Sequence, residues 1–172
     1  RDVFAEQAQE LAAAGADGLV VETMCDLDEA TIALEAAKAT GLAVVVCMVF
    51  DSGKDQERTM MGRTPEQVTE ALTAAGADVI GANCGSGVSG YVSVCRRMRA
   101  ATTRPIWIKP NAGLPEIVDG RVVYRMTPQE FAGQAAALSD AGANFIGGCC
   151  GTDPAFIQAL GERLRDSRHG FR

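Results

Sequence analysis

Short apolar runs alternate along the chain with longer segments in which apolar residues recur every three or four positions. The longer segments have the spacing of amphipathic helices, and the short continuous runs are typical of strands in a parallel sheet. The pattern predicts strands at residues 17–23, 42–50, 77–82, 105–109 and 143–147. It predicts helices at residues 3–14, 26–38, 64–75, 88–101 and 127–140, and a sixth that opens at Asp153-Pro154. This alternation of strand and helix places the chain in the α/β class.

Local signals support several of these boundaries. Residues 64–67, Thr-Pro-Glu-Gln, combine an N-cap, a first-turn proline and the glutamine of a capping box. Asp26, followed three residues later by Glu29, has the same spacing. Residues 116–126 contain Asp119-Gly120 between two β-favouring runs, which predicts a small hairpin.

A weak internal repeat indicates how the elements are arranged. Ala-Gly-Ala followed by Asp or Asn occurs three times, ending at Asp17, Asp78 and Asn144, each time where a helix ends and a strand begins. Such recurrence is typical of a βα barrel or a doubly wound sheet. A complete (β/α)8 barrel takes around 250 residues. We therefore expect residues 1–172 to form one domain, the C-terminal part of such a barrel, with about three N-terminal βα units absent.

The start of the chain and its sheet edges carry two related expectations. The sequence starts at Arg1, without a methionine and inside a predicted helix, so we expect a fragment of a longer protein. A partial barrel leaves parallel edge strands open, which favours self-association.

Composition narrows the possible functions. The net charge is −6 with no basic stripe, which argues against a nucleic-acid surface. There is no apolar run of about 18 residues and no signal-peptide pattern, so we expect a cytoplasmic protein without a membrane segment. Six cysteines in such a chain do not form a small disulfide framework, which favours a reducing compartment. The charged tail after Arg165, which includes the sole histidine, His169, is expected to be frayed and solvated.

Three cysteines follow two of the predicted strands. Cys84 lies in Gly-Ala-Asn-Cys-Gly after one apolar run, and Cys149 and Cys150 lie in Gly-Gly-Cys-Cys-Gly after another. The carboxyl ends of parallel strands form the site edge of α/β proteins. Three thiolates can hold Zn²⁺ and leave the fourth tetrahedral position for water or substrate. Because a thiolate-rich site is soft, its natural fourth ligand is another sulfur.

Other interpretations of the cysteines stay open at this point. Each could be a small core residue, and Cys149-Cys150 could be a redox-active dithiol. Cys47 falls within a predicted strand and Cys95 on a predicted helix, so we expect both in the core. Cys25 lies nearer the site edge, but we assign it no role in metal binding.

Four motifs together resemble the homocysteine S-methyltransferase family, above all the homocysteine-binding domain of cobalamin-dependent methionine synthases. In chain order they are Glu22-Thr23, residues 81–84 (Gly-Ala-Asn-Cys), residues 109–115 (Lys-Pro-Asn-Ala-Gly-Leu-Pro) and residues 147–151 (Gly-Gly-Cys-Cys-Gly). The resemblance spans essentially the whole chain. An early Asp-Gly-rich motif that shapes the amino-acid pocket in the family has no counterpart here.

The resemblance implies a zinc-dependent (β/α)8 barrel in which Cys84, Cys149 and Cys150 are the metal ligands and act in catalysis. The homocysteine sulfur would take the fourth position and accept a methyl group, giving methionine. Glu22 would bind the amino group of homocysteine, and Asn83 and Asn111 complete the implied substrate site. Asn111 would also offer an oxygen to zinc while substrate is absent. The donor would be methylcobalamin on another domain or protein, betaine or S-methylmethionine.

Rival functions rest on other residues. Lys109 ends a strand, where barrel aldolases place a Schiff-base lysine, so a lyase is one alternative; the competing interpretation is a solvent-exposed lysine. A thiol redox or phosphate-binding module is another, with Gly81, Gly85 and Gly87 as a phosphate cradle, although no Walker-type lysine follows. In the polar loop 51–63, Lys54 and Arg58 would dock an anionic donor or be simply solvated.

Overall fold

The computed structural model describes residues 1–169, and the side chains of residues 1–165. Five parallel strands form one sheet, as predicted. In spatial order they are β1 (Gly18–Met24), β2 (Ala43–Met48), β3 (Val79–Cys84), β4 (Ile106–Pro110) and β7 (Phe145–Ile146). Because the spatial order follows the chain order and the strands are parallel, all five carboxyl ends lie at the same edge of the sheet.

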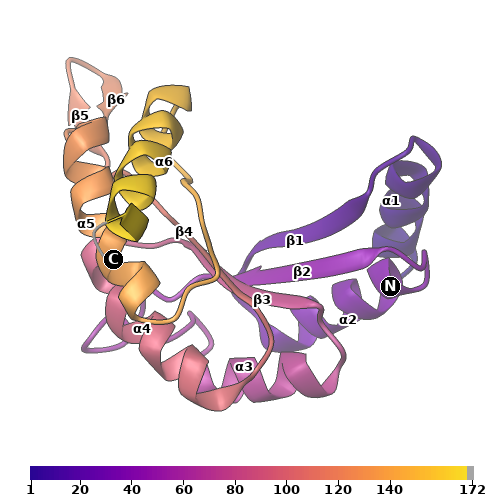
Figure 1. Cartoon of the computed structure of the whole chain (residues 1–172). Coiled ribbons are helices and arrows are strands. Elements are labelled where there is room, and N and C mark those ends of the chain that lie inside the picture. The colour runs from indigo at the N-terminus through magenta and orange to yellow at the C-terminus, as the bar shows by residue number, and fades with distance from the viewer. Residues whose placement is uncertain (170–172) are drawn as a thin grey trace.

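Six helices accompany the sheet. They are α1 (Asp2–Ala13), α2 (Leu27–Lys38), α3 (Pro65–Ala74), α4 (Val88–Ala101), α5 (Pro128–Asp140) and α6 (Pro154–His169). Figure 1 shows a curved, open sheet with the helices along its outer side, α1 near one end and α6 near the other. Such an arrangement is an open portion of a (β/α) barrel. None of the described helices combines the length and apolar character needed to cross a membrane.

The hydrophobic core fills the space between the convex side of the sheet and the helices. Val44 and Val46 of β2 belong to the same buried cluster as Leu34 of α2 and Leu72 of α3, and all four are fully buried. The alternate residues of each strand point to the concave side. There Gly81 is required, because a Cβ would lie 2.3 Å from the Trp107 carbonyl oxygen and 2.7 Å from Cys47 Sγ.

The predicted local signals are confirmed where they rest on short-range contacts. Thr64 and Gln67 form a reciprocal capping box at the start of α3. At α2 only half of the capping box expected from Asp26 and Glu29 is found: Asp26 Oδ1 accepts hydrogen bonds from two backbone N–H groups in the first turn, without a reciprocal bond from the Glu29 side chain. The hairpin consists of β5 (Glu116–Val118) and β6 (Arg121–Val123), and its turn residues Asp119 and Gly120 have φ of 50° and 73°.

Most strand and helix ends differ from the prediction by one or two residues, and three of the differences have a clear structural cause. β3 continues to Cys84 rather than ending at residue 82, because Asn83 and Cys84 pair with Lys109 and Pro110 of β4. β7 has two residues rather than the predicted five, since it pairs only with β4 and two glycines follow it. α6 continues past Arg165, where fraying was expected, because the next helix breaker is Gly170. The expectation that the His169 side chain is solvated lies outside the described side chains.

Candidate metal centre

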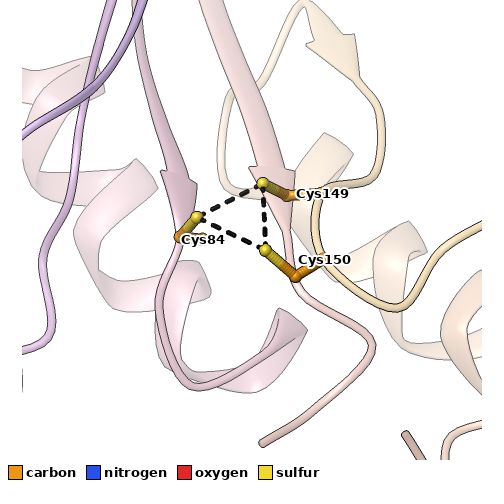
Figure 2. A group of neighbouring side chains, drawn as sticks. All are labelled: Cys84, Cys149 and Cys150. Atoms are coloured by element: carbon orange, nitrogen blue, oxygen red, sulfur yellow. Dashed lines mark hydrogen bonds between the residues drawn. The ribbon is translucent and has the colours of Figure 1, made fainter. Parts of the chain in front are cut away.

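The three predicted thiols lie together at the carboxyl edge of the sheet, where their sulfur atoms point toward one another (Figure 2). Cys84 Sγ is 3.3 Å from Cys149 Sγ and 3.9 Å from Cys150 Sγ, and the last two are 4.0 Å apart. Three sulfurs at about 2.3 Å from one tetrahedral zinc ion are about 3.8 Å apart. The observed spacing therefore fits a zinc ion bound by three thiolates.

The backbone conformation at Cys84 and Cys149 fixes the direction of their side chains. Cys84 ends β3 with φ of 63°, and Gly85 follows at 68°, so the chain turns sharply once the thiol is placed. Cys149 is held by a 3.0 Å hydrogen bond from its N–H to the Pro110 carbonyl at the end of β4. The strand between the two ligand segments thus fixes the second segment relative to the first.

Asn83 is fully buried beside the thiols. Its Nδ2 lies 3.5 Å from Cys84 Sγ and 3.6 Å from Cys149 Sγ, and also donates to Thr23 Oγ1 at 2.7 Å. Its Oδ1 accepts from the Thr23 N–H at 2.9 Å. An amide donor to a thiolate is the kind of supporting contact that orients metal ligands. Asn83 therefore lies against the cysteine cluster, and its implied role in substrate binding stays a prediction.

Asn111 holds the backbone of Cys150. Its Oδ1 accepts from the Cys150 N–H at 2.9 Å, and its Nδ2 donates to the Gly85 carbonyl at 3.0 Å. These two contacts connect the loop after β4 to both cysteine-containing turns. Asn111 is only 8% exposed, so it is a buried residue that connects the two cysteine-containing turns.

The negative charges of three neighbouring thiolates would need a cation to balance them. Burial raises the pKa of Cys84 to about 12, reinforced by its hydrogen bond with Cys149 and by the like charges of both other thiolates. Burial also opposes ionisation of Cys149, but hydrogen bonds from Asn83 and Cys84 outweigh it and lower the pKa of this thiol. Three negative charges at these distances repel one another strongly in the absence of a cation. The donor set and its charge thus suit a soft divalent metal.

Glu22 reaches the same edge from β1 and meets Lys109 of β4. Lys109 Nζ lies 2.7 Å from Glu22 Oε1 and 4.4 Å from the centroid of the Trp107 ring. The interpretation of Lys109 as solvent-exposed is wrong, because the residue is only 6% exposed. The reason is that its stem packs near Gly147, where an added Cβ would lie 3.2 Å from Lys109 Cγ. The lyase alternative also loses support, since Glu22 engages the amine.

The other cysteines stay outside the metal centre. Cys47 and Cys95 are fully buried, as predicted for core residues. Among the residues whose side chains are described, the group of potential metal ligands contains Cys84, Cys149 and Cys150 but not Cys25.

Two tyrosines near the site were not predicted from the sequence. The Tyr91 hydroxyl on α4 donates to the Asn83 carbonyl at 2.5 Å, and the Tyr124 ring lies against Gly151. In the sequence, Tyr91 occupies a position typical of the buried face of a helix, and Tyr124 directly follows a hairpin strand. Neither pattern distinguishes a site residue from a packing residue.

The loop 51–63 is anchored to α4 by an ion pair. Arg97 of α4 binds Glu57 of this loop at 2.6 Å and Glu66 of α3 at 2.6 Å. Arg58 donates to the Gly62 carbonyl within the loop itself. The docking of a methyl donor by Lys54 and Arg58 stays a prediction.

Fold and site together define a protein of the (β/α) barrel type with three thiols, at the carboxyl ends of its strands, that could hold a metal ion. Residues 1–164 match the homocysteine S-methyltransferase family, so the chain belongs to that family, as its motifs predicted.

Named relatives differ in length and in the share of each that this chain covers. Methionine synthase of Mycobacterium tuberculosis is 33% identical over 165 residues, which cover 93% of this chain and 14% of that protein. The S-methylmethionine–homocysteine S-methyltransferase of Mus musculus is 30% identical over 191 residues, covering 99% of this chain and 50% of that enzyme. The chain thus spans at most about half the length of these two relatives.

Solved structures share the fold. The apo form of the homocysteine methyltransferase MmuM from Escherichia coli superposes with a TM-score of 0.74 at 24% identity, over 94% of this chain and 57% of that one. A metallated form of the same enzyme matches equally well. These likenesses confirm that the fold is of the (β/α)8 barrel type.

Proposed function

We propose that this chain supplies the zinc centre and the homocysteine site of a methyltransferase that forms methionine. The observation that carries the proposal is the cluster of Cys84, Cys149 and Cys150, with sulfur–sulfur distances of 3.3, 3.9 and 4.0 Å. Family membership adds the expected substrate class. Zn²⁺ at this cluster would lower the pKa of a bound thiol, so that the thiol is ionised at neutral pH without a general base.

Each side chain of the site has a distinct part in this proposal. Cys84, Cys149 and Cys150 would hold the ion. Asn83 donates toward two of these sulfurs and so keeps them oriented as thiolates. Asn111 holds the Cys150 backbone and thereby the third ligand. Glu22 offers its carboxylate on the concave side for the amino group of homocysteine.

The transfer itself needs an ionised thiol in line with an activated methyl group. The sulfur of homocysteine forms the new carbon–sulfur bond with one of its electron pairs, and the bond from the methyl carbon to the donor breaks. The thiol proton leaves to solvent before the transfer, and the electron pair of the broken bond stays with the donor. Relatives are named for methionine synthase, betaine and S-methylmethionine activities, and any of these donors could deliver the methyl group to the same thiol. For a cobalamin donor, we propose that a separate domain or protein carries it.

We further propose a cytoplasmic protein that does not bind nucleic acid, consistent with its charge of −6. β1 and β7 are the edges of the described sheet, and self-association through them is part of the same proposal.

Zinc content tests the proposal directly. We expect about one zinc per chain in the purified protein and a loss of zinc in Cys84→Ser. Cys25→Ser is the matched control, because this cysteine lies outside the cluster and should leave zinc unchanged. X-ray absorption should show a fourth sulfur ligand when homocysteine is added. Absence of zinc, or zinc that is indifferent to Cys84→Ser, would contradict the proposal.

A further inference from the structure

The ion pair between Glu22 and Lys109 spans the concave side of the sheet. Glu22 lies on β1 and Lys109 on β4, with β2 and β3 between them. In a flat sheet three strand spacings would separate their backbones by about 14 Å. The charged atoms nevertheless meet at 2.7 Å. The sheet is strongly curved (Figure 1), which brings β1 and β4 closer together than in a flat sheet. The pair therefore lies inside the mouth of the partial barrel.

The two partners are unequally accessible. The side chain of Lys109 is 8% exposed, whereas that of Glu22 is 43% exposed. Lys109 has a second partner in the Trp107 ring, 4.4 Å from its ammonium. A cation held in this way keeps a favourable contact when its carboxylate partner turns away. Glu22 is thus the exchangeable partner and Lys109 the fixed one.

Lys109 is also close to the metal ligands. It is in register with Asn83 on the neighbouring strand, so the two side chains project from the same face about 4.8 Å apart. Asn83 in turn lies 3.5 Å and 3.6 Å from the sulfurs of Cys84 and Cys149. Asn83 therefore lies between Lys109 and the cysteine cluster.

We infer that Lys109 is a substrate-positioning residue that binds the α-carboxylate of the amino-acid thiol, while Glu22 binds its α-ammonium. In the free protein the two side chains satisfy each other. When substrate enters, its zwitterionic end replaces this one ion pair with two, and its thiol points to the cysteine cluster. This inference rests on the proposed function and deepens it, because it assigns the group that selects an α-amino acid over a simple thiol.

Analogues that lack one charge test the inference. The probe is the 172-residue chain loaded with Co²⁺, whose sulfur-to-metal charge-transfer absorption reports binding of a thiol at the metal. The ligands are homocysteine, 3-aminopropane-1-thiol, which lacks the carboxylate, and 4-mercaptobutanoate, which lacks the ammonium. Wild-type protein should bind homocysteine about tenfold to a hundredfold more tightly than either analogue, the range expected for a hydrogen-bonded charge.

Lys109→Met should remove the preference for homocysteine over 3-aminopropane-1-thiol. Binding of the analogue itself should be unchanged or tighter, because Glu22 then has no competing partner. Glu22→Gln should give the mirror result, with homocysteine weakened and 4-mercaptobutanoate unaffected. Lys38→Met is the matched control, since Lys38 makes a half-exposed ion pair with Asp78 at 3.6 Å. If Lys109→Met does not fold, Lys109→Gln is measured in the same comparison.

The outcomes separate this inference from the proposed function. If Lys109→Met keeps the preference, or weakens homocysteine and 3-aminopropane-1-thiol by the same factor, the lysine has only a structural role and the inference is overturned. In both of these cases thiol binding at the metal still stands. If no thiol changes the absorption of the wild-type protein, the proposed function fails and the inference fails with it.

Discussion

Thr23 and Asn83 exchange two hydrogen bonds between β1 and β3, passing over the intervening strand β2. The Thr23 N–H donates to Asn83 Oδ1 at 2.9 Å, and Asn83 Nδ2 donates to Thr23 Oγ1 at 2.7 Å. Thr23 has φ of 61°, a conformation that is unfavourable for a β-branched residue, at an irregularity in the pairing of β1 with β2. Asn83 therefore stabilises the strained backbone beside Glu22 and also contacts the thiols.

Asn83→Leu tests this double role. Loss of the amide leaves the Thr23 N–H without its partner and removes a donor to two sulfurs. We expect the free energy of unfolding to fall by about 1–3 kcal/mol and metal affinity to fall about tenfold to a hundredfold. Chemical denaturation and competition with a chelator measure the two effects. Asn144→Leu is the control, since Asn144 caps the Ile106 N–H at 2.9 Å far from the thiols. Metal affinity that falls equally in both variants would contradict the prediction.

Gly151 packs closely against the Tyr124 ring. It has φ of 79°, and an added Cβ would lie 2.2 to 2.6 Å from the Tyr124 ring. Gly151→Ala must therefore strain the backbone and displace the ring beside Cys150. Gly120→Ala has the same backbone cost, about 1 kcal/mol, but nothing lies within 4 Å of its Cβ. We expect Gly151→Ala to lower the melting temperature more than Gly120→Ala and to weaken metal binding; equal effects would mean that Tyr124 moves freely.

The stability that Arg97 provides should depend on pH. Its hydrogen bond to Glu66 lowers the pKa of that carboxyl to about 2. A lowered pKa stabilises the fold fully above the unfolded value of about 4.3 and loses this effect as pH falls toward 2. We expect Arg97→Met to cost about 1 kcal/mol near neutral pH, because the groups are about a third exposed.

Urea unfolding at several pH values measures this dependence. The difference between wild type and Arg97→Met should shrink from pH 5 to pH 2. Arg125→Met is the control, since its pair with Glu116 is more than half exposed on both sides. A difference that grows on acidification would show that the Arg97 cluster acts in the opposite sense.

Oxidation of the metal-free protein should join Cys84 to Cys149. These sulfurs are 3.3 Å apart, whereas those of the adjacent pair Cys149 and Cys150 are 4.0 Å apart. A mild oxidant such as diamide takes up the two electrons and two protons that the thiols release. Mass spectrometry of tryptic peptides would then show the two cysteine segments linked. Zinc-loaded protein should be protected, and a disulfide within the Cys149-Cys150 peptide would contradict the prediction.

Features that depend on interactions between residues close in sequence could be predicted from the sequence. The capping box at Thr64 and the hairpin turn at Asp119 depend on neighbouring residues, so their types and spacing were sufficient. The position of Cys84 beside Cys149 followed from the rule that parallel strands end at one edge. The family motifs added the identity of the chemistry.

Long-range packing explains what the sequence did not reveal. The burial of Lys109 depends on Trp107 beside it and on Glu22 three strands away, which no local pattern encodes. β7 is short because it pairs only with β4, a property of the sheet rather than of residues 143–147. The contact between Tyr91 and the Asn83 carbonyl likewise needs the helix α4 to pack against the end of β3.

The thiol cluster joins two strand ends that are not neighbours in the sheet. Cys84 and Cys149 are 65 residues apart in sequence, and α4, β4, the hairpin and α5 lie between them. An ion held by both would close this segment into a ring, and the corresponding loss of chain entropy in the unfolded state is worth about 4 kcal/mol for a disulfide of that span. Loading with metal would then constrain the segment from Cys84 to Cys149 in the unfolded chain. Removal of the metal would make unfolding of that segment easier.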